Sequence, residues 1–247
     1  MLVDVALKNH FHTTDLMAGV DGAVCAVIDV IRATSTVATL FGNGVKSIFI
    51  ASTLEEALTY KERFPERVLC GEKDGVAPRG FDYGNSPAEF SRVDFAGKNA
   101  ILKTTNGTAS FLRAKKSPAV FSLAALNFRV TMEAMVKKAS SLASDILLIC
   151  SGQEGRVAYD DCYIAGMAVK YLMKKPKGLR FSDSAKMVLS LNLGDKNIEE
   201  ALKKSSSAIF CYEHGLGEDV PFCARLNEYN VAVRADISGK IPELLLD

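Results

Sequence analysis

The stretch AVIDVIRATSTVATLFGNG, residues 26–44, joins a buried strand to a helix through a polar turn. Apolar residues end the strand, and Asp29 and Arg32 follow within the next few positions. Three hydroxyl residues, Thr34, Ser35 and Thr36, then open an apolar, helix-like run that the GNG at 42–44 terminates. Ligands of open α/β sheets bind beyond the carboxyl ends of the strands, so this junction predicts a binding site.

The bulk composition is that of an ordinary globular protein. The chain has 247 residues, 48% of them hydrophobic, and a net charge of +1. This predicts one large domain, 1–247, with two intimate lobes (1–125 and 126–247) as the alternative. The near-zero net charge gives no global field for nucleic acid or an anionic membrane, so neither is expected as a partner.

Several features favour a cytoplasmic protein. No apolar run approaches roughly 18 residues, and the N-terminus MLVDVALKNHF lacks the order of a signal peptide. The six cysteines form no CxxC and are typical of reduced, mostly buried thiols.

Strand-like runs alternate with helix patterns along most of the chain. The runs lie at 2–7, 23–30, 45–50, 67–71, 99–104, 118–123, 144–150 and 231–235. The alternation predicts a layered α/β protein with a largely parallel or mixed sheet, followed by a helical cluster over 176–230. No internal repeat is visible in the sequence.

Two further strand-to-helix junctions resemble the first. In ILKTTNGTASFL (101–112), Asn106, Gly107 and Thr108 would let the backbone approach an oxyanion, although a plain turn with a Thr cap is the alternative. The segment 145–166 contains Glu154, Arg156, Asp160 and Asp161. Such acids suit a hard metal ion with oxygen ligands.

Other interpretations stay open for these junctions. Asp29 and Arg32 could form a simple ion pair beside capping hydroxyls. Cys150 and Arg156 have the Cys-x5-Arg spacing of cysteine-dependent phosphatases. The acids that follow Cys150 would raise the pKa of its thiol and repel phosphate, so the metal interpretation is preferred.

A long polar loop at 70–90 supplies Glu72, Lys73, Arg79 and Asn85. Such a loop can cover a site and bring a second anion-binding group, or it can be merely solvated. Its GNSP predicts a helix start at Pro87. His10, His12 and His214 receive no role.

The motifs DVIRATST, GE followed by a basic residue, GFDYGNSP, TTNGT and EGR…DDCYIAG occur in this order. In this wording and order they resemble the 2-phosphosulfolactate phosphatase family. The resemblance implies a layered α/β/α fold and a magnesium-dependent phosphatase of coenzyme M biosynthesis that removes phosphate from 2-phospho-3-sulfolactate. The family's site pattern would fall on Asp29, Arg32, Glu72, Asn85, Asn106, Glu154 and Asp161. Lys73 and Asp160 stand where an arginine and a glutamate are expected.

The sequence thus leads to one hypothesis about the site. Asp29, Arg32 and Glu154 act in catalysis, and Mg²⁺ is held by Asp29, Glu72, Glu154 and Asp161. The substrate, a small phosphorylated anion, is bound by Thr34, Ser35, Thr36, Lys73, Arg79, Asn85, Asn106, Gly107, Thr108 and Arg156. Asp29 either attacks phosphorus or only holds the ion. A non-catalytic phosphate- or sulfonate-binding protein is the other class, and a homodimer is the candidate assembly.

Overall fold

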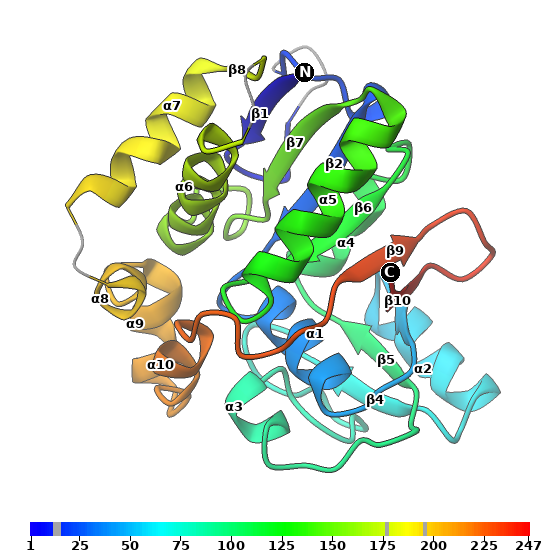
Figure 1. Ribbon diagram of the computed structural model, residues 1–247. Coiled ribbons are helices and arrows are strands. Elements are labelled where there is room, and N and C mark those ends of the chain that lie inside the picture. The colour runs from blue at the N-terminus through cyan, green and yellow to red at the C-terminus, as the bar shows by residue number, and fades with distance from the viewer. Residues whose placement is uncertain (12–15, 176–177, 195–196) are drawn as a thin grey trace.

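The computed structural model describes residues 1–11, 16–175, 178–194 and 197–247, so His12 lies outside the described residues (Figure 1). Its strands are β1 (Leu2–Ala6), β2 (Ala23–Ile28), β3 (Ile48–Ile50), β4 (Val68–Gly71), β5 (Ala100–Lys103), β6 (Val120–Leu123), β7 (Asp145–Cys150), β8 (Arg180–Phe181), β9 (Val233–Asp236) and β10 (Glu243–Leu246). Its helices are η2 (Val20–Gly22), α1 (Ala33–Gly42), α2 (Leu54–Arg63), α3 (Pro87–Phe90), α4 (Gly107–Arg113), α5 (Phe128–Leu142), α6 (Tyr159–Met173), α7 (Asp183–Ser190), η3 (Leu191–Leu193), α8 (Ile198–Leu202), α9 (Ser206–Glu213) and α10 (Asp219–Cys223).

All these strands belong to one mixed sheet, in the order β4-β5-β3-β10-β9-β6-β2-β7-β1-β8. The strands β4, β5 and β3 are parallel to one another, and so are β6, β2, β7, β1 and β8. The antiparallel pair β10–β9 joins these two groups, which therefore run in opposite directions. The expected layered, mixed α/β sheet is confirmed.

The strand order contains a repeat that the sequence did not reveal. The chain runs β2-α1-β3-α2-β4 and then again β5-α4-β6-α5-β7. The two units exchange strands: β5 pairs with β3 and β4 of the first unit, and β2 pairs with β6 and β7 of the second. The order β4-β5-β3-β10 is therefore mirrored by β7-β2-β6-β9 across the sheet.

Both faces of the sheet are buried under helices. In β2, the side chains of Val24, Ala26 and Ile28 pack with those of α5 and α6, whereas Cys25 and Val27 pack with those of α1 and α4 on the other face. This alternation follows from the two-residue period of a strand. Figure 1 shows α5 lying across β2 and β6, with α7 to α10 gathered along one side.

The eight predicted strands are all present, with shifts of a few residues at their ends. Two short strands were missed. β8 has two residues, and it lies in the part read as helical. β10 lacks an alternating pattern, and its pairing depends on β3 and β9 from distant parts of the chain. No helix in the described part of the chain has the length and apolar character needed to cross a bilayer.

Candidate active site

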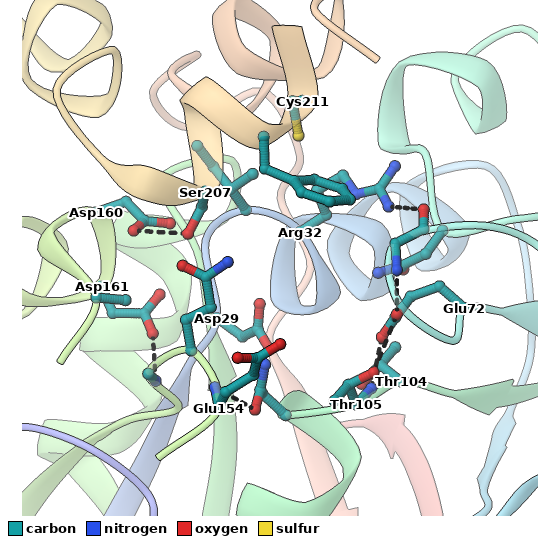
Figure 2. A pocket seen from close by; sticks show the side chains of 18 of the residues that line it. Asp29, Arg32, Glu72, Thr104, Thr105, Glu154, Asp160, Asp161, Ser207 and Cys211 are labelled. Carbon is teal, nitrogen blue, oxygen red and sulfur yellow. Dashed lines mark hydrogen bonds between the residues drawn. The ribbon is translucent and has the colours of Figure 1, made fainter. Parts of the chain in front are cut away.

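One polar cavity of about 190 Å³ lies where the segments after β2, β4, β5 and β7 meet (Figure 2). In a flat sheet, two oppositely directed groups of strands would end at opposite edges. Strand twist of about 20–25° per step accumulates to roughly 100–125° over the five steps from β5 to β2, which turns the two groups toward a common mouth. The lining includes Asp29, Arg32, Glu72, Asp74, Gly75, Asn85, Thr104, Thr105, Asn106, Gln153, Glu154, Asp160, Asp161, Ser207, Phe210 and Cys211.

The two repeat units build their strand-to-helix turns in the same way. Thr34 Oγ1 donates to the carbonyl of Asp29 at 2.8 Å and accepts from its N–H at 3.1 Å. Thr108 Oγ1 donates to the carbonyl of Thr104 at 2.7 Å and accepts from its N–H at 3.4 Å. Asp29 and Thr104 are therefore equivalent positions, and the second unit carries a neutral residue where the first carries an acid.

The hydroxyls predicted to bind substrate are instead used within the fold. Besides Thr34 and Thr108, Ser35 donates to the carbonyl of Val30 at 2.7 Å, and Thr36 donates to that of Asn85 at 3.2 Å. All four side chains are buried and lie outside the cavity lining. These hydroxyls therefore fit the alternative in which they cap the turns, because each already donates its proton to a backbone carbonyl.

Each unit also ends in a tight hairpin that reaches the cavity. Lys73 and Val76 exchange backbone hydrogen bonds in one hairpin, as Gln153 and Arg156 do in the other. Positive φ angles occur at the two tip residues of each, which are Asp74–Gly75 (54° and 82°) and Glu154–Gly155 (51° and 76°). These are the left-handed conformations that a two-residue hairpin turn requires.

A carboxylate links each hairpin to the turn of its neighbouring strand. Glu72 accepts from Thr105 N at 2.5 Å and from Gly75 N at 2.9 Å. Asp161 accepts from Val30 N at 2.9 Å and from Gly152 N at 2.9 Å. Both residues were predicted to hold a metal, but each carboxylate oxygen already accepts a backbone hydrogen bond.

Of the buried acids on the cavity wall, Asp29, Asp160 and Asp161 have raised pKa values (Figure 2). Burial is the main cause for Asp29, whose pKa rises to about 7 with further increases from the charges of Asp160 and Glu72. Burial likewise raises the pKa of Asp160 to about 6. The pKa of Asp161 lies well above its usual range because of burial and the charges of Asp160 and Asp29. Raised pKa values in a cavity are typical of functional sites.

Arg32 lies beside these acids but is already engaged. Its Nη1 donates to Asp219 Oδ2 at 3.0 Å, and its Nη2 donates to the carbonyl of Gly75 at 2.8 Å. The sequence predicted that Arg32 would lie at the same mouth as Asp29, and both line the cavity. It did not predict that Asp219 would be its partner.

Asn85 lines the same cavity and is buried, and its Oδ1 atom has no hydrogen-bond partner among the described residues. A buried carbonyl oxygen without a donor is unfavourable and rare, so Asn85 Oδ1 is a candidate contact for a ligand, water or ion in this cavity. Asn106 also reaches the lining, whereas Gly107 lies just behind it at the N-terminus of α4.

Several predicted charges are not brought into the cavity. Lys73 and Arg79 are exposed and lie outside the lining. Arg156 is also outside it and pairs with Glu154 at 3.1 Å, with about three quarters of its side chain exposed. Glu154 therefore lies at the rim. The four predicted metal ligands do not assemble, because no group of three or more acidic, His or Cys side chains among the described residues is arranged to hold an ion.

The structure argues against the cysteine mechanism. Cys150 is fully buried in the core beneath α6, and a hydrogen bond with Cys162 together with burial raises the pKa of its thiol well above the usual value. It does not line the cavity. A thiolate nucleophile requires the opposite conditions, a lowered pKa and access to substrate.

Sequence reasoning missed several lining residues. Asp160 was grouped with the acids that suit a metal ion but was left out of the predicted site, whereas it faces the cavity and accepts from Ser207 Oγ at 3.2 Å. Ser207, Phe210 and Cys211 come from α9, where no local motif marks them. Thr104 and Thr105 belong to a motif that had been found, and their position directly after β5 was the available signal.

Together these features define a layered α/β enzyme with a compact, acid-lined site at the ends of its strands. The model of the family described as 2-phosphosulpholactate phosphatase matches residues 11–236. A Deinococcus radiodurans protein named "Probable 2-phosphosulfolactate phosphatase" is 37% identical over 83% of this chain and 84% of its own. Proteins of the same name from Thermus thermophilus and Clostridium perfringens are 34% and 30% identical, over 90% and 92% of this chain and 91% and 90% of theirs.

The chain therefore belongs to the 2-phosphosulfolactate phosphatase family and is a phosphoric monoester hydrolase.

Proposed function

We propose that the protein is a magnesium-dependent phosphatase that hydrolyses 2-phospho-3-sulfolactate, or a similarly compact phosphorylated hydroxy acid, to the alcohol and inorganic phosphate. Family membership supports the reaction class. The observation that carries the proposal is the convergence of the buried acids Asp29, Asp160 and Asp161 on a cavity that Arg32 also lines.

The size of the cavity supports a small substrate. Its volume of about 190 Å³ is below the roughly 300–1,000 Å³ of sites for drug-sized ligands. A compact anion and a few waters suit such a space. Lys73, Arg79 and Arg156 lie outside it, so Arg32 and backbone N–H groups have the larger part in anion recognition.

The chemistry of the donors fits Mg²⁺. The oxygen atoms of buried carboxylates are ligands of hard cations, and negative groups that raise one another's pKa values are stabilised by a cation among them. Asp29 Oδ2 accepts no hydrogen bond from the described residues, so Asp29 would be the main protein ligand of the ion. Mg²⁺ commonly keeps several waters and uses one or two carboxylates plus substrate oxygens, so it does not require a larger ligand cluster than the described residues provide.

When bound, Mg²⁺ neutralises charge on the phosphoryl oxygens. The remaining work falls to the protein's own residues. Arg32 donates N–H groups to the phosphoryl group, and Asn85 Oδ1, which is an acceptor, receives a hydrogen bond from a hydroxyl group or a water in the site. The hairpin tips at Gly75 and Glu154 narrow the mouth of the site.

The test is release of inorganic phosphate from synthetic 2-phospho-3-sulfolactate, with Mg²⁺ and with EDTA. A panel of phosphorylated hydroxy acids, with and without a sulfonate, identifies the preferred substrate. Turnover that requires Mg²⁺ and favours a compact dianionic substrate supports the proposal. Tight binding without turnover would instead favour a binding protein, and turnover in EDTA would rule out the metal.

A further inference from the structure

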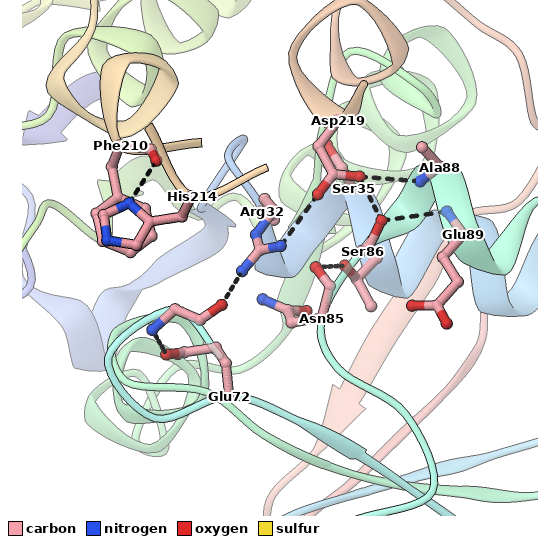
Figure 3. Close-up of polar contacts among 12 residues, drawn as sticks. Arg32, Ser35, Glu72, Asn85, Ser86, Ala88, Glu89, Phe210, His214 and Asp219 are labelled. Carbon is pink, nitrogen blue, oxygen red and sulfur yellow. Dashed lines mark hydrogen bonds and ion pairs between the residues drawn. The ribbon is translucent and has the colours of Figure 1, made fainter. Parts of the chain in front are cut away.

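Two fixed contacts hold the guanidinium of Arg32 from opposite ends (Figure 3). Nη1 donates to Asp219 Oδ2 at 3.0 Å, and Nη2 donates to the carbonyl of Gly75 at 2.8 Å. A guanidinium carries five N–H groups. These contacts leave Nε–H and one N–H on each terminal nitrogen, in a side chain that lines the cavity while only 6% of its surface is exposed.

Asp219 is itself held in place. Its Oδ1 accepts from Ser86 Oγ at 2.6 Å and from Ala88 N at 3.1 Å, both at the N-terminus of α3. Its side chain is 1% exposed, and it lies outside the cavity lining. Asp219 therefore faces Arg32 from behind the site, as a carboxylate with no freedom to turn away.

The Gly75 side of the clamp is supported as well. Gly75 N donates to Glu72 Oε2, and Glu72 is anchored on Thr105. A β-carbon on Gly75 would lie 2.3 Å from the ring of Phe210, so this hairpin tip is packed tightly against α9. Arg32 is thus positioned by the β4 hairpin on one side and by α10 on the other.

We propose that Asp219 is a positioning residue of the active site, which orients Arg32 so that its remaining N–H groups face a phosphoryl oxygen in the cavity. The inference rests on the proposed function, because it assumes that the cavity takes a phosphoryl group. It gives the C-terminal helical segment a part in recognition, although Asp219 follows Arg32 by 187 residues.

A purely structural ion pair is the competing explanation. Buried ion pairs contribute little net stability, because their attraction mainly offsets the cost of removing two charges from water. Here, however, one member of the ion pair, Arg32, also lines the cavity. Its guanidinium keeps N–H groups that the pair does not use. A planar fork that is already fixed loses less conformational entropy when it binds an oxyanion.

The test is a double-mutant cycle on inorganic phosphate binding, measured by titration calorimetry with Mg²⁺ present. The variants are Asp219→Asn, Arg32→Lys and the double variant. We expect Asp219→Asn to weaken phosphate binding by about 10- to 100-fold, by analogy with the range for residues that orient metal ligands. The double variant should lose little more phosphate affinity than Arg32→Lys alone, since each change removes the oriented guanidinium of Arg32 from the site.

Glu218→Gln is the matched control. Glu218 adjoins Asp219 and pairs with Arg92 at 2.7 Å, but this pair is exposed, so phosphate binding should be unchanged. Losses that simply add in the double variant, or an unchanged affinity in Asp219→Asn, would overturn the inference. So would a wild-type protein that binds no phosphate.

If Asp219→Asn does not fold, Ser86→Ala decides the question. It removes one of the two hydrogen bonds that fix Asp219 and leaves the contact with Arg32, so a loss of several-fold is expected, and full affinity would overturn the inference. A wild type that binds phosphate but hydrolyses nothing would count against the proposed function alone, because the binding cycle still decides the role of Asp219.

Discussion

The Oδ2 atom of Asp29 lies 2.9 Å from the position that a β-carbon on Gly107 would occupy. The same β-carbon would lie 2.5 Å from the methyl group of Ala33, so the two strand-to-helix turns touch at this point. The N-terminus of α4 in the second repeat unit thus forms the floor beneath the acid of the first. Glycine is needed here for close approach rather than for an unusual backbone angle.

Gly107→Ala should therefore disturb Asp29. The added methyl group should reduce kcat/KM by at least about tenfold through displacement of the carboxylate, at a cost of about 1–3 kcal/mol in unfolding free energy from overpacking. Gly22→Ala is the control, because a β-carbon there would meet nothing within 4 Å. Steady-state kinetics and urea denaturation measure both effects. Equal, unimpaired activity in the two variants would show that the contact at Gly107 is unimportant.

The raised pKa values of the buried acids predict how stability depends on pH without metal. The folded-state pKa values of Asp29 and Asp160, about 7 and 6, lie above their usual value of 3.8, so the folded protein binds more protons than the unfolded chain between about pH 4 and 7. These groups therefore lower stability as pH rises through that range. Urea denaturation in EDTA should show that the free energy of unfolding falls less steeply with rising pH for Asp29→Asn than for wild type.

Mg²⁺ should oppose this loss, since binding to the ionised acids stabilises the folded state by an amount that grows with the logarithm of the metal concentration above the dissociation constant. The gain in unfolding midpoint should be larger at pH 8 than at pH 5, and it should shrink in Asp29→Asn. A gain that is the same at both pH values, or is unchanged in the variant, would place the ion elsewhere.

The arginines should differ in importance. Arg32→Lys keeps the charge but loses the planar fork, so kcat/KM should fall by roughly 10²-fold, similar to loss of one preorganised donor. Arg79→Gln and Arg156→Gln should change it only a few-fold, because both side chains are exposed and lie outside the cavity lining. Kinetics on a sulfonated substrate and on an aryl phosphate test this. A larger loss for Arg79→Gln than for Arg32→Lys would reverse the assignment.

Cys150→Ser should keep most of the activity and lose some stability, because a hydroxyl replaces a thiol among apolar side chains. Chelation by EDTA should abolish activity in wild type and variant alike. Phosphate release with and without the chelator is the measurement. Phosphate release that persists in EDTA but is lost in the Cys150→Ser variant would support the thiol mechanism instead.

Local signals were sufficient for much of the fold. Residues 52–56 read STLEE, which is a capping-box pattern, and in the structure Thr53 Oγ1 accepts from Glu56 N while Glu56 accepts from Ser52 N. The helix predicted to begin at Pro87 begins there, with Ser86 as its N-cap. Such features depend on a few neighbouring residues, and the sequence contains them completely.

Long-range features were not accessible in this way. The repeat is not visible in the sequence, and its units exchange strands, so neither half forms its own sheet. The partner of Arg32 comes from α10, and the local sequence of Asp219 suggests only a helix start. The hydroxyls of Thr34 to Thr36 were misassigned for a related reason: a hydroxyl after a strand suits both a ligand and a backbone cap, and only packing decides which.

The most direct test of the central claim is phosphate release from 2-phospho-3-sulfolactate by wild type and Asp29→Asn at saturating Mg²⁺. Asp29→Asn is nearly isosteric and keeps the hydrogen bond from Ala33 N within reach, so the turn should survive while the charge is lost. We predict Mg²⁺-dependent turnover by wild type and a loss of at least about 10³-fold in kcat for the variant, the upper range for one preorganised electrostatic group. A folded Asp29→Asn enzyme with wild-type turnover would contradict the account.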